Sequence, residues 1–435
     1  MKETGFSTYT ILKDRAILVS LVSGEESGEL AAYSLEELVR LAETAGVEVL
    51  DTVVQRKEKA DSRWLVGKGK VEEVKMQLRA MDGTTVIFNQ ELTGGQVRNL
   101  EAELDAKIID RTQLILDIFA QRAKTREGIL QVELAQLSYL LPRLSGHGKN
   151  LSRLGGGIGT RGPGETKLEM DRRHIRRRIS DLRRQLEEVT RHRKLHRERR
   201  KKTGMMQAAL VGYTNAGKST ILNRLTDSDV YAENQLFATL DPTSRNVTLP
   251  SGGELILTDT VGFIQHLPHD LVAAFRATLE EVLEADLILH VVDASSSMRD
   301  EQMRVVDEVL SGLGAESKER LKVYNKIDQC TREQLEQIPG DSETFRMSAL
   351  NDADLEAFKA LLEARLMGEV LTFRLPATRG DLIALVYRVG DVLQSETSDE
   401  EVCLNVKIHA KTYEQSGSRL EPYLYPSRNY NGRIR

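Results

Sequence analysis

Residues 208–225 read AALVGYTNAGKSTILNRL, which is an apolar run, a glycine-containing loop and the beginning of a helix. The loop fits the pattern G-x-x-x-x-G-K-S, with the strand before it and the helix after it that this pattern requires. Backbone N–H groups of such a loop surround a phosphate chain. Lys218 would place its charge at the β- and γ-phosphates, and the Ser219 hydroxyl would bind Mg²⁺. The stretch therefore predicts an α/β domain of the P-loop class. The expected phosphate-binding residues are Gly212, Tyr213, Thr214, Asn215, Ala216, Gly217, Lys218 and Ser219.

Three further segments follow the loop in the order typical of GTPases. LILTDTVGF ends an apolar strand with a carboxylate, KVYNKIDQC follows another strand, and FRMSAL supplies a short loop. We expect the carboxylate of LILTDTVGF to reach Mg²⁺ through water and the glycine N–H of the same segment to meet the γ-phosphate. We expect KVYNKIDQC and FRMSAL to bind the base. The site residues of the three segments are Asp259, Thr260, Val261 and Gly262; Asn325, Lys326, Ile327 and Asp328; and Ser348, Ala349 and Leu350.

The carboxylate of Asp328 indicates which base is bound. It can accept hydrogen bonds from guanine N1–H and from the 2-amino group together, whereas adenine offers neither donor there. A site built on such hydrogen bonds rejects an analogue that lacks them by ~10⁴-fold or more. The sequence therefore predicts GTP as the nucleotide, with the backbone of residues 348–350 near guanine O6.

Two further features bear on hydrolysis. A threonine that binds Mg²⁺ should lie between the P-loop and Asp259, and LFATLDPTSRNV offers Thr239 and Thr243. Phe263 occupies the position after D-x-x-G at which Ras-like GTPases carry the glutamine that orients the attacking water. A phenyl ring cannot orient water, so we expect slow intrinsic hydrolysis unless another group does so. Asn215 is a candidate ligand for a monovalent cation such as K⁺, the alternative being an asparagine that only stabilises the loop.

The rest of the chain divides into three parts. Residues 1–125 alternate strand and helix patterns, which predicts a small, mostly parallel α/β domain. Its first helix is expected to have Ser34 as N-cap, and KIIDRTQLILDIF is expected to be a strand. Residues 126–203 hold two helices with a 3.5-residue apolar repeat, which predicts a long antiparallel coiled-coil hairpin with a glycine-rich tip loop at 145–166. The GTPase domain, with a mixed, mostly parallel sheet, covers 204–368, and 369–435 predict a small α+β domain with a helix over DLIALVYRVGDVL.

Positive charge is concentrated in the hairpin. The whole chain carries −5, but residues 171–202 hold 15 Lys and Arg against 5 Asp and Glu, which leaves +10 on this segment and −15 on the remainder. Such segregation favours a polyanionic partner, the alternative being a solvated helix with a simple connecting loop. The candidate RNA-binding residues are Arg153, Arg161, Lys167, Arg172, Arg173, Arg176 and Arg177.

The stretch GGGIGTRGPGETKLE at 155–169 contains a match to the dinucleotide pattern G-x-G-x-x-G. That pattern requires a preceding strand, but LPRLSGHGKNLSR has no strand pattern, and the helix that follows is long and charged. Glycine lets a backbone approach a crowded partner closely, and exposed N–H groups suit the phosphates and splayed bases of structured RNA. The loop is therefore predicted to bind RNA rather than a dinucleotide.

Composition excludes several classes of protein. With 40% hydrophobic and 29% charged residues, the chain is typical of soluble globular proteins. It has no run of 18 apolar residues that could span a membrane and no apolar signal-type segment near residue 1. Cys330 and Cys403 form neither a disulfide framework nor a metal-ligand pattern. We expect a monomeric cytoplasmic protein without a transmembrane segment, with peripheral membrane association left open.

The segments GGGIGTRGPGETKLEMDRR, GYTNAGKST, FATLDPT, DTVGFIQHLPHDLVAAF and NKID, in that order, resemble the HflX family of bacterial GTPases. DRTQLILDIFAQRAKTREGILQVELAQL extends the resemblance upstream, so that it spans about residues 15–365, and the residues beyond match the family poorly. The resemblance implies that Ser219 and Thr239 bind Mg²⁺. The implied nucleotide-binding segment around this threonine is Phe237, Ala238, Thr239, Leu240 and Asp241. The candidate catalytic residues are Lys218, Thr239, Gly262 and Asn215.

The resemblance also implies a function. It implies a GTPase that binds the large (50S) ribosomal subunit with its 23S rRNA and dissociates stalled or vacant 70S ribosomes, notably under heat or other stress, with hydrolysis to GDP driving release. ATP binding by the N-terminal domain is implied as well, although residues 1–125 contain no second Walker-type loop. The alternatives are an assembly factor acting on immature 50S particles, an rRNA-remodelling (helicase-like) factor, and a signalling switch with a protein partner.

Overall fold

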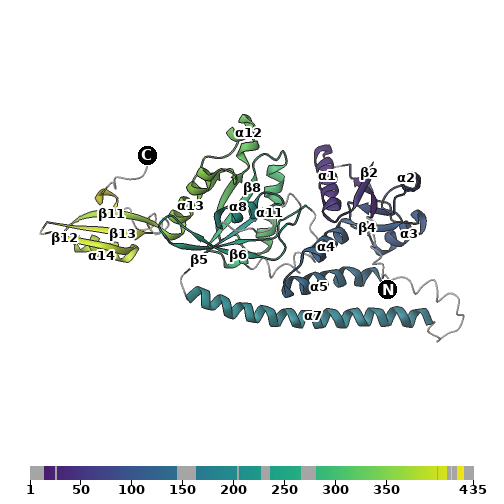
Figure 1. Cartoon of the computed structure of the whole chain (residues 1–435), viewed down its shortest axis with the longest axis horizontal. Helices are drawn as coiled ribbons and strands as arrows, with labels where there is room; N and C mark the ends of the chain where they lie inside the picture. The colour runs from purple at the N-terminus through teal and green to yellow at the C-terminus, as the bar shows by residue number, and fades with distance from the viewer. Residues whose placement is uncertain are drawn as a thin grey trace, which may run out of the picture.

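The computed structural model describes residues 14–24, 27–144, 163–202, 205–226, 236–265, 281–398, 400–408, 413 and 419–425. Within the helix of residues 163–202, side chains are described for 169–191. Three sheets lie in a row, each with its own helices, and a long helix runs beneath the first two (Figure 1). No helix in the described residues is long and apolar enough to cross a membrane.

The N-terminal sheet is entirely parallel, in the strand order β2-β1-β3-β4, as the alternating pattern predicted. Its helices cover both faces, and α4 follows directly on the last strand. The elements are β1 (Arg15–Val22), α1 (Gly28–Thr44), β2 (Glu48–Arg56), α2 (Lys68–Ala80), β3 (Thr85–Phe88), α3 (Gly94–Leu104), β4 (Lys107–Asp110) and α4 (Arg111–Arg122).

Two local predictions in this domain are wrong. Helix α1 begins earlier than expected, because the Ser27 hydroxyl accepts from the Leu30 N–H at 3.2 Å and is the N-cap. Ser34 is buried inside the helix, where its Oγ accepts from Asn89 Nδ2 at 2.9 Å. The strand expected within KIIDRTQLILDIF ends at Asp110, whose carboxylate caps α4 by accepting from the Gln113 N–H at 2.9 Å.

The GTPase domain is built on a six-stranded sheet in the order β10-β9-β8-β5-β7-β6. All neighbours are parallel except β6 and β7, which confirms the mixed, mostly parallel sheet. The P-loop follows the central strand β5, where ligands of open α/β sheets bind. The elements are β5 (Met206–Gly212), α8 (Lys218–Thr226), β6 (Thr243–Thr248), β7 (Glu254–Asp259), β8 (Leu287–Asp293), α11 (Arg299–Gly312), β9 (Glu319–Asn325), a 3₁₀ turn (Ile327–Gln329), α12 (Arg332–Glu336), β10 (Thr344–Arg346) and α13 (Asp352–Met367).

Helices α5 (Arg126–Arg143) and α7 (Pro163–Lys202) lie side by side and antiparallel (Figure 1). Of the apolar seam, Leu130, Ile179 and Leu182 are buried, at 7%, 8% and 0% exposure, and the other positions of the repeat are half-buried. Arg178 of α7 forms a bidentate ion pair with Glu133 of α5, in which Nε donates to Oε1 at 2.6 Å and Nη2 to Oε2 at 2.7 Å. The pair is not a free-standing hairpin, since α5 also packs on α4.

The C-terminal sheet is antiparallel, in the order β12-β13-β11-β14, and α14 packs on it. The helix expected over DLIALVYRVGDVL ends at Val389, and a strand begins at Asp391. Gly390 lies at the change, and a Cβ there would come 2.7 Å from the Lys407 carbonyl oxygen on β13, so the close packing of the chain on β13 requires glycine. The elements are β11 (Glu369–Pro376), α14 (Gly380–Val389), β12 (Asp391–Thr397), β13 (Glu401–Ile408), a 3₁₀ turn (Glu421–Tyr423) and β14 (Leu424–Tyr425).

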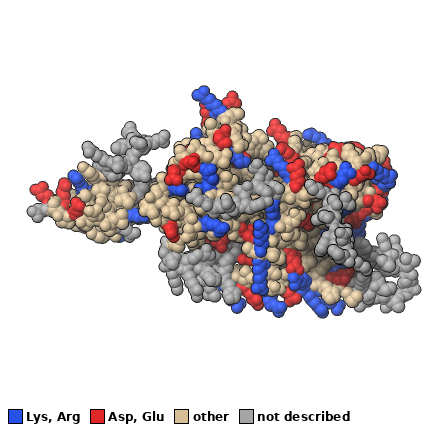
Figure 2. Space-filling model, in the orientation of Figure 1, with Lys and Arg blue, Asp and Glu red and all other residues tan. Residues whose placement is uncertain are grey.

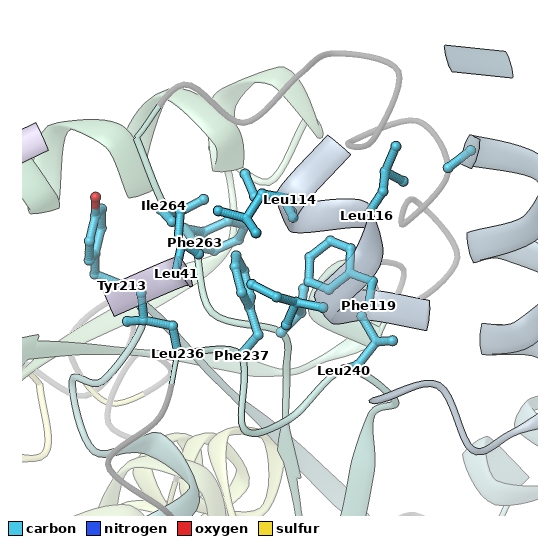
Figure 3. Packing of buried hydrophobic residues seen from close by; sticks show 14 of the residues in the cluster. Leu41, Leu114, Leu116, Phe119, Tyr213, Leu236, Phe237, Leu240, Phe263 and Ile264 are labelled. Atoms are coloured by element: carbon cyan, nitrogen blue, oxygen red, sulfur yellow. The ribbon is translucent and has the colours of Figure 1, made fainter. Parts of the chain in front are cut away.

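One hydrophobic core joins the first three parts of the chain. It combines Leu41 of α1, Phe119 of α4 and Val132 of α5 with Phe237 and Phe263 of the GTPase domain, all buried. Figure 3 shows side chains from α4 pointing toward the loop of residues 236–240. The C-terminal sheet has its own separate core. One core of the GTPase domain is therefore shared with α1, α4 and α5, whereas a second core lies within the GTPase domain itself. Neither includes residues of the C-terminal sheet.

Candidate nucleotide-binding site

The two glycines of the P-loop are required by what lies against them. Gly212 has φ +155°, and a Cβ there would lie 2.2 Å from the Val291 carbonyl oxygen on β8. Gly217 has φ +98°, and its Cβ would lie 2.2 Å from Asn325 Nδ2. Only glycine permits both the left-handed backbone and this approach. The neighbouring strand and the base-binding loop thus fix the shape of the phosphate loop.

Lys218 lies folded back over the loop. Its Nζ is buried and donates to the carbonyl oxygens of Gly212 at 3.1 Å and Tyr213 at 2.8 Å. Burial lowers the pKa of Lys218 to about 8, and the nearby Asp259 carboxylate opposes this shift. The ammonium therefore lies on the loop that the motif predicts to surround the phosphates.

Three oxygen ligands meet at one point beside the loop. The Asp259 Oδ2 accepts from the hydroxyls of Ser219 and Thr239, each at 2.7 Å, and the two hydroxyls are 2.9 Å apart. Asp259 is 0% exposed, and burial raises its pKa against the opposing effects of Lys218 and the hydroxyls. The structure thus brings Thr239, rather than Thr243, together with Ser219.

This donor set fits Mg²⁺. Hydroxyl and carboxylate oxygens are its usual ligands, and it commonly keeps several waters beside few protein groups. Among the described residues, Asp259 Oδ1 and Thr214 Oγ1 are buried without a hydrogen-bond partner, as expected of atoms that face a bound group. Ser219 and Thr239 would hold the ion, with Asp259 behind them, and the ion would neutralise charge on the phosphates.

The base-binding segments lie together beyond the loop. Asp328, Ser348 and Leu350 line an open pocket of about 490 Å³ with Ile327, Asn351 and Asp354. Lys326 has φ +63° and forms an ion pair with Asp293 at 2.6 Å. Sequence reasoning missed Asp293, although it ends β8 at the same edge of the sheet as the P-loop.

Asn325 has a bracing role that its motif did not reveal. Its Nδ2 donates to the Ala216 carbonyl oxygen and its Oδ1 accepts from the Ala349 N–H, both at 2.9 Å. The buried side chain therefore ties the phosphate loop to the loop at the base, and Ala349 is held by it.

The D-x-x-G segment lies directly on the P-loop. A Cβ on Gly262 would come 2.9 Å from Thr214 Cα and 3.1 Å from Lys218 Nζ, so this position needs glycine. Phe263 exchanges backbone hydrogen bonds with Gly212 at 3.1 Å and Thr214 at 2.8 Å. Its ring is 1% exposed and belongs to the shared core, so it cannot orient water. Residues 266–280, which include most of the segment FIQHLPHDLV, lie outside the described residues.

The N-terminal domain contacts this site, which the sequence did not indicate. The Tyr213 hydroxyl of the P-loop donates to Glu37 of α1 at 2.5 Å and accepts from the Gln265 N–H at 2.8 Å. Arg111 at the start of α4 pairs with the same Glu37 and donates to the Gln265 carbonyl oxygen at 3.3 Å. Burial raises the pKa values of Tyr213 and Glu37, and Arg111 opposes the rise at Glu37.

The segment that carries Thr239 is held from the other side. Phe237 has φ +56°, and its ring meets that of Phe119 edge-on with centroids 4.6 Å apart. The side chain of Asp241, predicted to bind nucleotide, is instead directed at α5, where it accepts from the Lys124 and Thr125 N–H groups at 2.9 and 2.8 Å. Ala238 and Leu240 lie between these contacts.

The candidate RNA-binding residues are placed only in part. Arg173, Arg176 and Arg177 are exposed on α7, and Arg172 is half-buried. Figure 2 shows basic and acidic side chains together along the lower edge, which α7 occupies in Figure 1. Arg153, Arg161, the tip loop and the side chain of Lys167 lie outside the described residues.

Together, the parallel sheet, the phosphate loop, the magnesium-type ligands and the guanine-type pocket define a P-loop GTPase. Residues 207–326 match the family described as 50S ribosome-binding GTPase. Residues 32–120 and 122–200 match the families described as GTP-binding GTPase N-terminal and GTP-binding GTPase Middle Region. The chain belongs to the HflX family of GTPases, and it hydrolyses GTP to GDP and phosphate.

Two relatives show how far the likeness extends. The GTPase HflX of Caldanaerobacter subterraneus subsp. tengcongensis is 51% identical over 406 residues, covering 93% of each chain. That of Escherichia coli K12 is 45% identical over 403 residues, covering 91% of this chain and 93% of the relative. These alignments are longer than residues 15–365, so the likeness extends beyond the range that the motifs indicated. A GTP-binding protein from Sulfolobus solfataricus, solved with GDP, is 24% identical with a TM-score of 0.43 and covers 80% of this chain and 97% of that one, too distant a likeness to bear on the site.

Proposed function

We propose that this GTPase binds the large ribosomal subunit through its 23S rRNA, in the GTP state, and separates stalled or vacant 70S ribosomes in the cytoplasm, notably under heat or other stress. The observation that carries the proposal is the match of residues 207–326 to a family described as ribosome-binding, in a chain that also has a basic helix. Hydrolysis to GDP then releases the factor.

The exposed arginines of α7 support an RNA-binding role. All four of Arg173, Arg176, Arg177 and Arg178 are exposed; Arg178 pairs with Glu133 of α5, and Arg176 lies 3.8 Å from Glu169 of its own helix. A helix of 40 residues is about 60 Å long at roughly 1.5 Å per residue, enough to follow several phosphates. Exposed arginines beside a packed seam suit phosphate contacts, which position a protein on RNA.

The nucleotide site supports a switch. Thr239 and Gly262 lie on different segments, Thr239 against Asp259 and Gly262 against Lys218. On the proposed reading, the γ-phosphate and Mg²⁺ of GTP would hold both segments, and GDP would not. The ribosome can respond only if its affinity for the two states differs. Because Phe263 cannot orient water, we propose that the bound ribosome completes the hydrolytic site.

The decisive experiment combines two assays. GTP hydrolysis is measured with and without 50S subunits, and 70S dissociation is followed by light scattering with GTP, GDP, ATP or no nucleotide. We expect stimulation by 50S subunits and dissociation with GTP. Preference for immature 50S particles would indicate an assembly factor, and RNA unwinding without subunit separation would indicate a remodelling factor. An absence of stimulation by RNA-containing particles would indicate a signalling switch. Each of these results would overturn the proposal.

The arginines of α7 give a second test. Replacing Arg172, Arg173, Arg176 and Arg177 with Gln should lower the slope of log K against log [salt] for 50S binding, because each phosphate contact contributes about 0.7–0.9 to that slope. A control variant removes four exposed charges away from α7, by changing Lys59, Lys68, Arg79 and Arg332 to Gln. Equal slopes for the two variants would contradict the role of α7.

We also propose that Asn215 binds a monovalent cation beside the phosphates. It is exposed in the P-loop with φ +60°, a conformation that asparagine tolerates. Faster turnover in KCl than in NaCl, lost in Asn215→Ala, is the expected result. Equal rates in both salts would leave Asn215 as a loop-stabilising residue.

A further inference from the structure

The N-terminus of α5 lies against the segment that carries the magnesium-binding threonine. Asp241, two residues after Thr239, accepts from the N–H groups of Lys124 and Thr125 at 2.9 and 2.8 Å and from the Thr125 hydroxyl at 2.5 Å. The Thr125 hydroxyl in turn caps α5 by accepting from the Gly128 N–H at 3.0 Å. A carboxylate at this place also interacts favourably with the helix dipole.

The contact is close enough to require a glycine. A Cβ on Gly128 would lie 2.2 Å from Asp241 Oδ1 and 3.2 Å from both Asp241 Cγ and Thr125 Oγ1. Glycine disfavours the interior of a helix by about 1 kcal/mol relative to alanine. Its presence in the first turn of α5 is thus explained by the carboxylate that approaches it.

A second anchor holds the same segment two residues before Thr239. Phe237 is 2% exposed, and its ring packs edge-on against Phe119 of α4, in the cluster that Figure 3 shows. Its φ of +56° is unusual for a bulky residue and persists only where the surroundings fix it. Thr239 therefore lies between two fixed contacts, that of Phe237 with α4 and that of Asp241 with the N-terminus of α5.

We infer that Thr125 and Gly128 of α5 are positioning residues for the GTP-bound state. By holding Asp241, they keep Thr239 beside Ser219 and Asp259, where its hydroxyl can serve the magnesium site. GDP places no γ-phosphate in reach of this segment, so its binding does not depend on the anchor. The helix that pairs with basic α7 thereby senses whether the triphosphate is bound, and this holds whether or not the ribosome is the partner.

The test uses the full chain and two fluorescent nucleotides, GDP and the non-hydrolysable guanosine 5′-(β,γ-imido)triphosphate, each with Mg²⁺. Gly128→Ala should weaken binding of the triphosphate about tenfold, the scale of a lost helix cap, and change GDP binding less than about twofold. Gly69→Ala is the matched control, because this helical glycine has open space at its β position and should leave both affinities unchanged.

A double variant separates this role from a general effect on α5. If Gly128→Ala acts by displacing Asp241, it should add nothing to Asp241→Ala. Thr125→Val should reproduce the selective loss of triphosphate binding, whereas Thr125→Ser, which keeps the hydroxyl, should bind the triphosphate as the parent does. This pair keeps the test valid if Gly128→Ala folds poorly. Hydrogen exchange at the Lys124 and Thr125 amides should be slower with the triphosphate than with GDP.

The inference is overturned by any of three results: equal loss of both nucleotides, no loss of either, or additive effects of the Gly128 and Asp241 substitutions. It is equally overturned if Gly69→Ala shows the same selective loss. Failure of 50S binding or of ribosome splitting would refute the proposed function and leave these nucleotide affinities as they are.

Discussion

Phe263 shows how a single side chain can separate nucleotide binding from hydrolysis. Its backbone pairs with Gly212 and Thr214 of the P-loop, so the residue sits at the right place for a water-orienting group. Its side chain, however, is turned into the core shared by α1 and α4. The position is therefore structural in this chain, and the hydrolytic water must be oriented by another group.

Replacing Phe263 with Gln should not restore fast hydrolysis. The amide would enter an apolar core, where losing the ring and burying an unpartnered polar group cost about 3 kcal/mol or more. We expect a lower unfolding temperature and a single-turnover GTP hydrolysis rate no higher than that of the parent. Phe263→Leu is the control for lost volume. A tenfold faster rate in the Gln variant would mean that the side chain can reach the phosphates.

His290 predicts an acid-sensitive GTPase domain. Its side chain is 2% exposed on β8, and burial, with the charges of Lys322 and Arg320 adding to it, lowers its pKa to about 3. The unfolded chain, with an ordinary pKa of 6.5, takes up a proton as pH falls below that value, and the folded chain does not. His290 thus stabilises the fold above pH 6.5 and loses that contribution as pH falls toward 3, by about 2 kcal/mol at pH 5.

This is tested by thermal unfolding between pH 8 and pH 5. His290→Gln removes the titrating group, so its unfolding temperature should fall less than that of the parent as the solution is acidified. Parallel curves for the two proteins would show that His290 is not responsible.

At the scale of elements, the middle of α1 and the first residue of α4 support the nucleotide site from outside the GTPase domain. Glu37 and Arg111 form a buried pair that meets Tyr213 of the P-loop and Gln265 after the D-x-x-G segment. A buried carboxylate that loses one donor keeps its desolvation cost, so such a network is costly to disrupt in part. The N-terminal domain is therefore part of the nucleotide site's support.

The Tyr213–Glu37 hydrogen bond should be strongly coupled. Tyr213→Phe is expected to lower the free energy of unfolding by about 1–3 kcal/mol, because it leaves Glu37 and the Gln265 N–H without this partner. Combined with Glu37→Gln, the loss should be less than additive by about 1 kcal/mol or more in a double-mutant cycle. Additive losses would contradict a direct link.

At the scale of the whole molecule, the cores show which parts depend on one another. The first hydrophobic core includes Leu41, Phe119 and Val132 together with Phe237 and Val211, so it crosses from the N-terminal domain through α5 to the GTPase domain. The C-terminal core, around Phe373 and Leu404, is separate. A domain with its own core can be removed with little effect on its neighbour.

Truncation should follow these cores. A chain ending at residue 368 is expected to fold and to bind GDP and the imidotriphosphate within about twofold of the full chain, since no residue of its sites lies beyond. Removing residues 1–110 instead takes Leu18, Leu38 and Leu41 from the shared core and should yield an aggregating or unfolded product. Unfolding of the first truncation, or full stability of the second, would contradict this division.

The nucleotide site was predictable from sequence in large part, because its residues are consecutive and act through backbone groups. Gly212 to Ser219, Asp259 and Asn325 to Asp328 each begin at the end of β5, β7 or β9, which run in the same direction, so the topology brings them to one edge. The choice between Thr239 and Thr243 came from the family resemblance, and the structure supports it by geometry. The predictions of Ser34 as N-cap and of the end of α14 were wrong, because caps and turns depend on neighbours such as Ser27, Asn89 and β13.

By itself, then, the sequence determined the P-loop class, the guanine nucleotide and the order of the parts, since each depends on short runs of residues with a fixed local geometry. Only the tertiary structure decided that Glu37 and Arg111 support the P-loop, that Asp241 faces α5 and that Phe263 is buried. Those contacts join residues more than 100 positions apart, and hydrogen bonding and burial between such residues follow from how the domains pack, which no local pattern encodes.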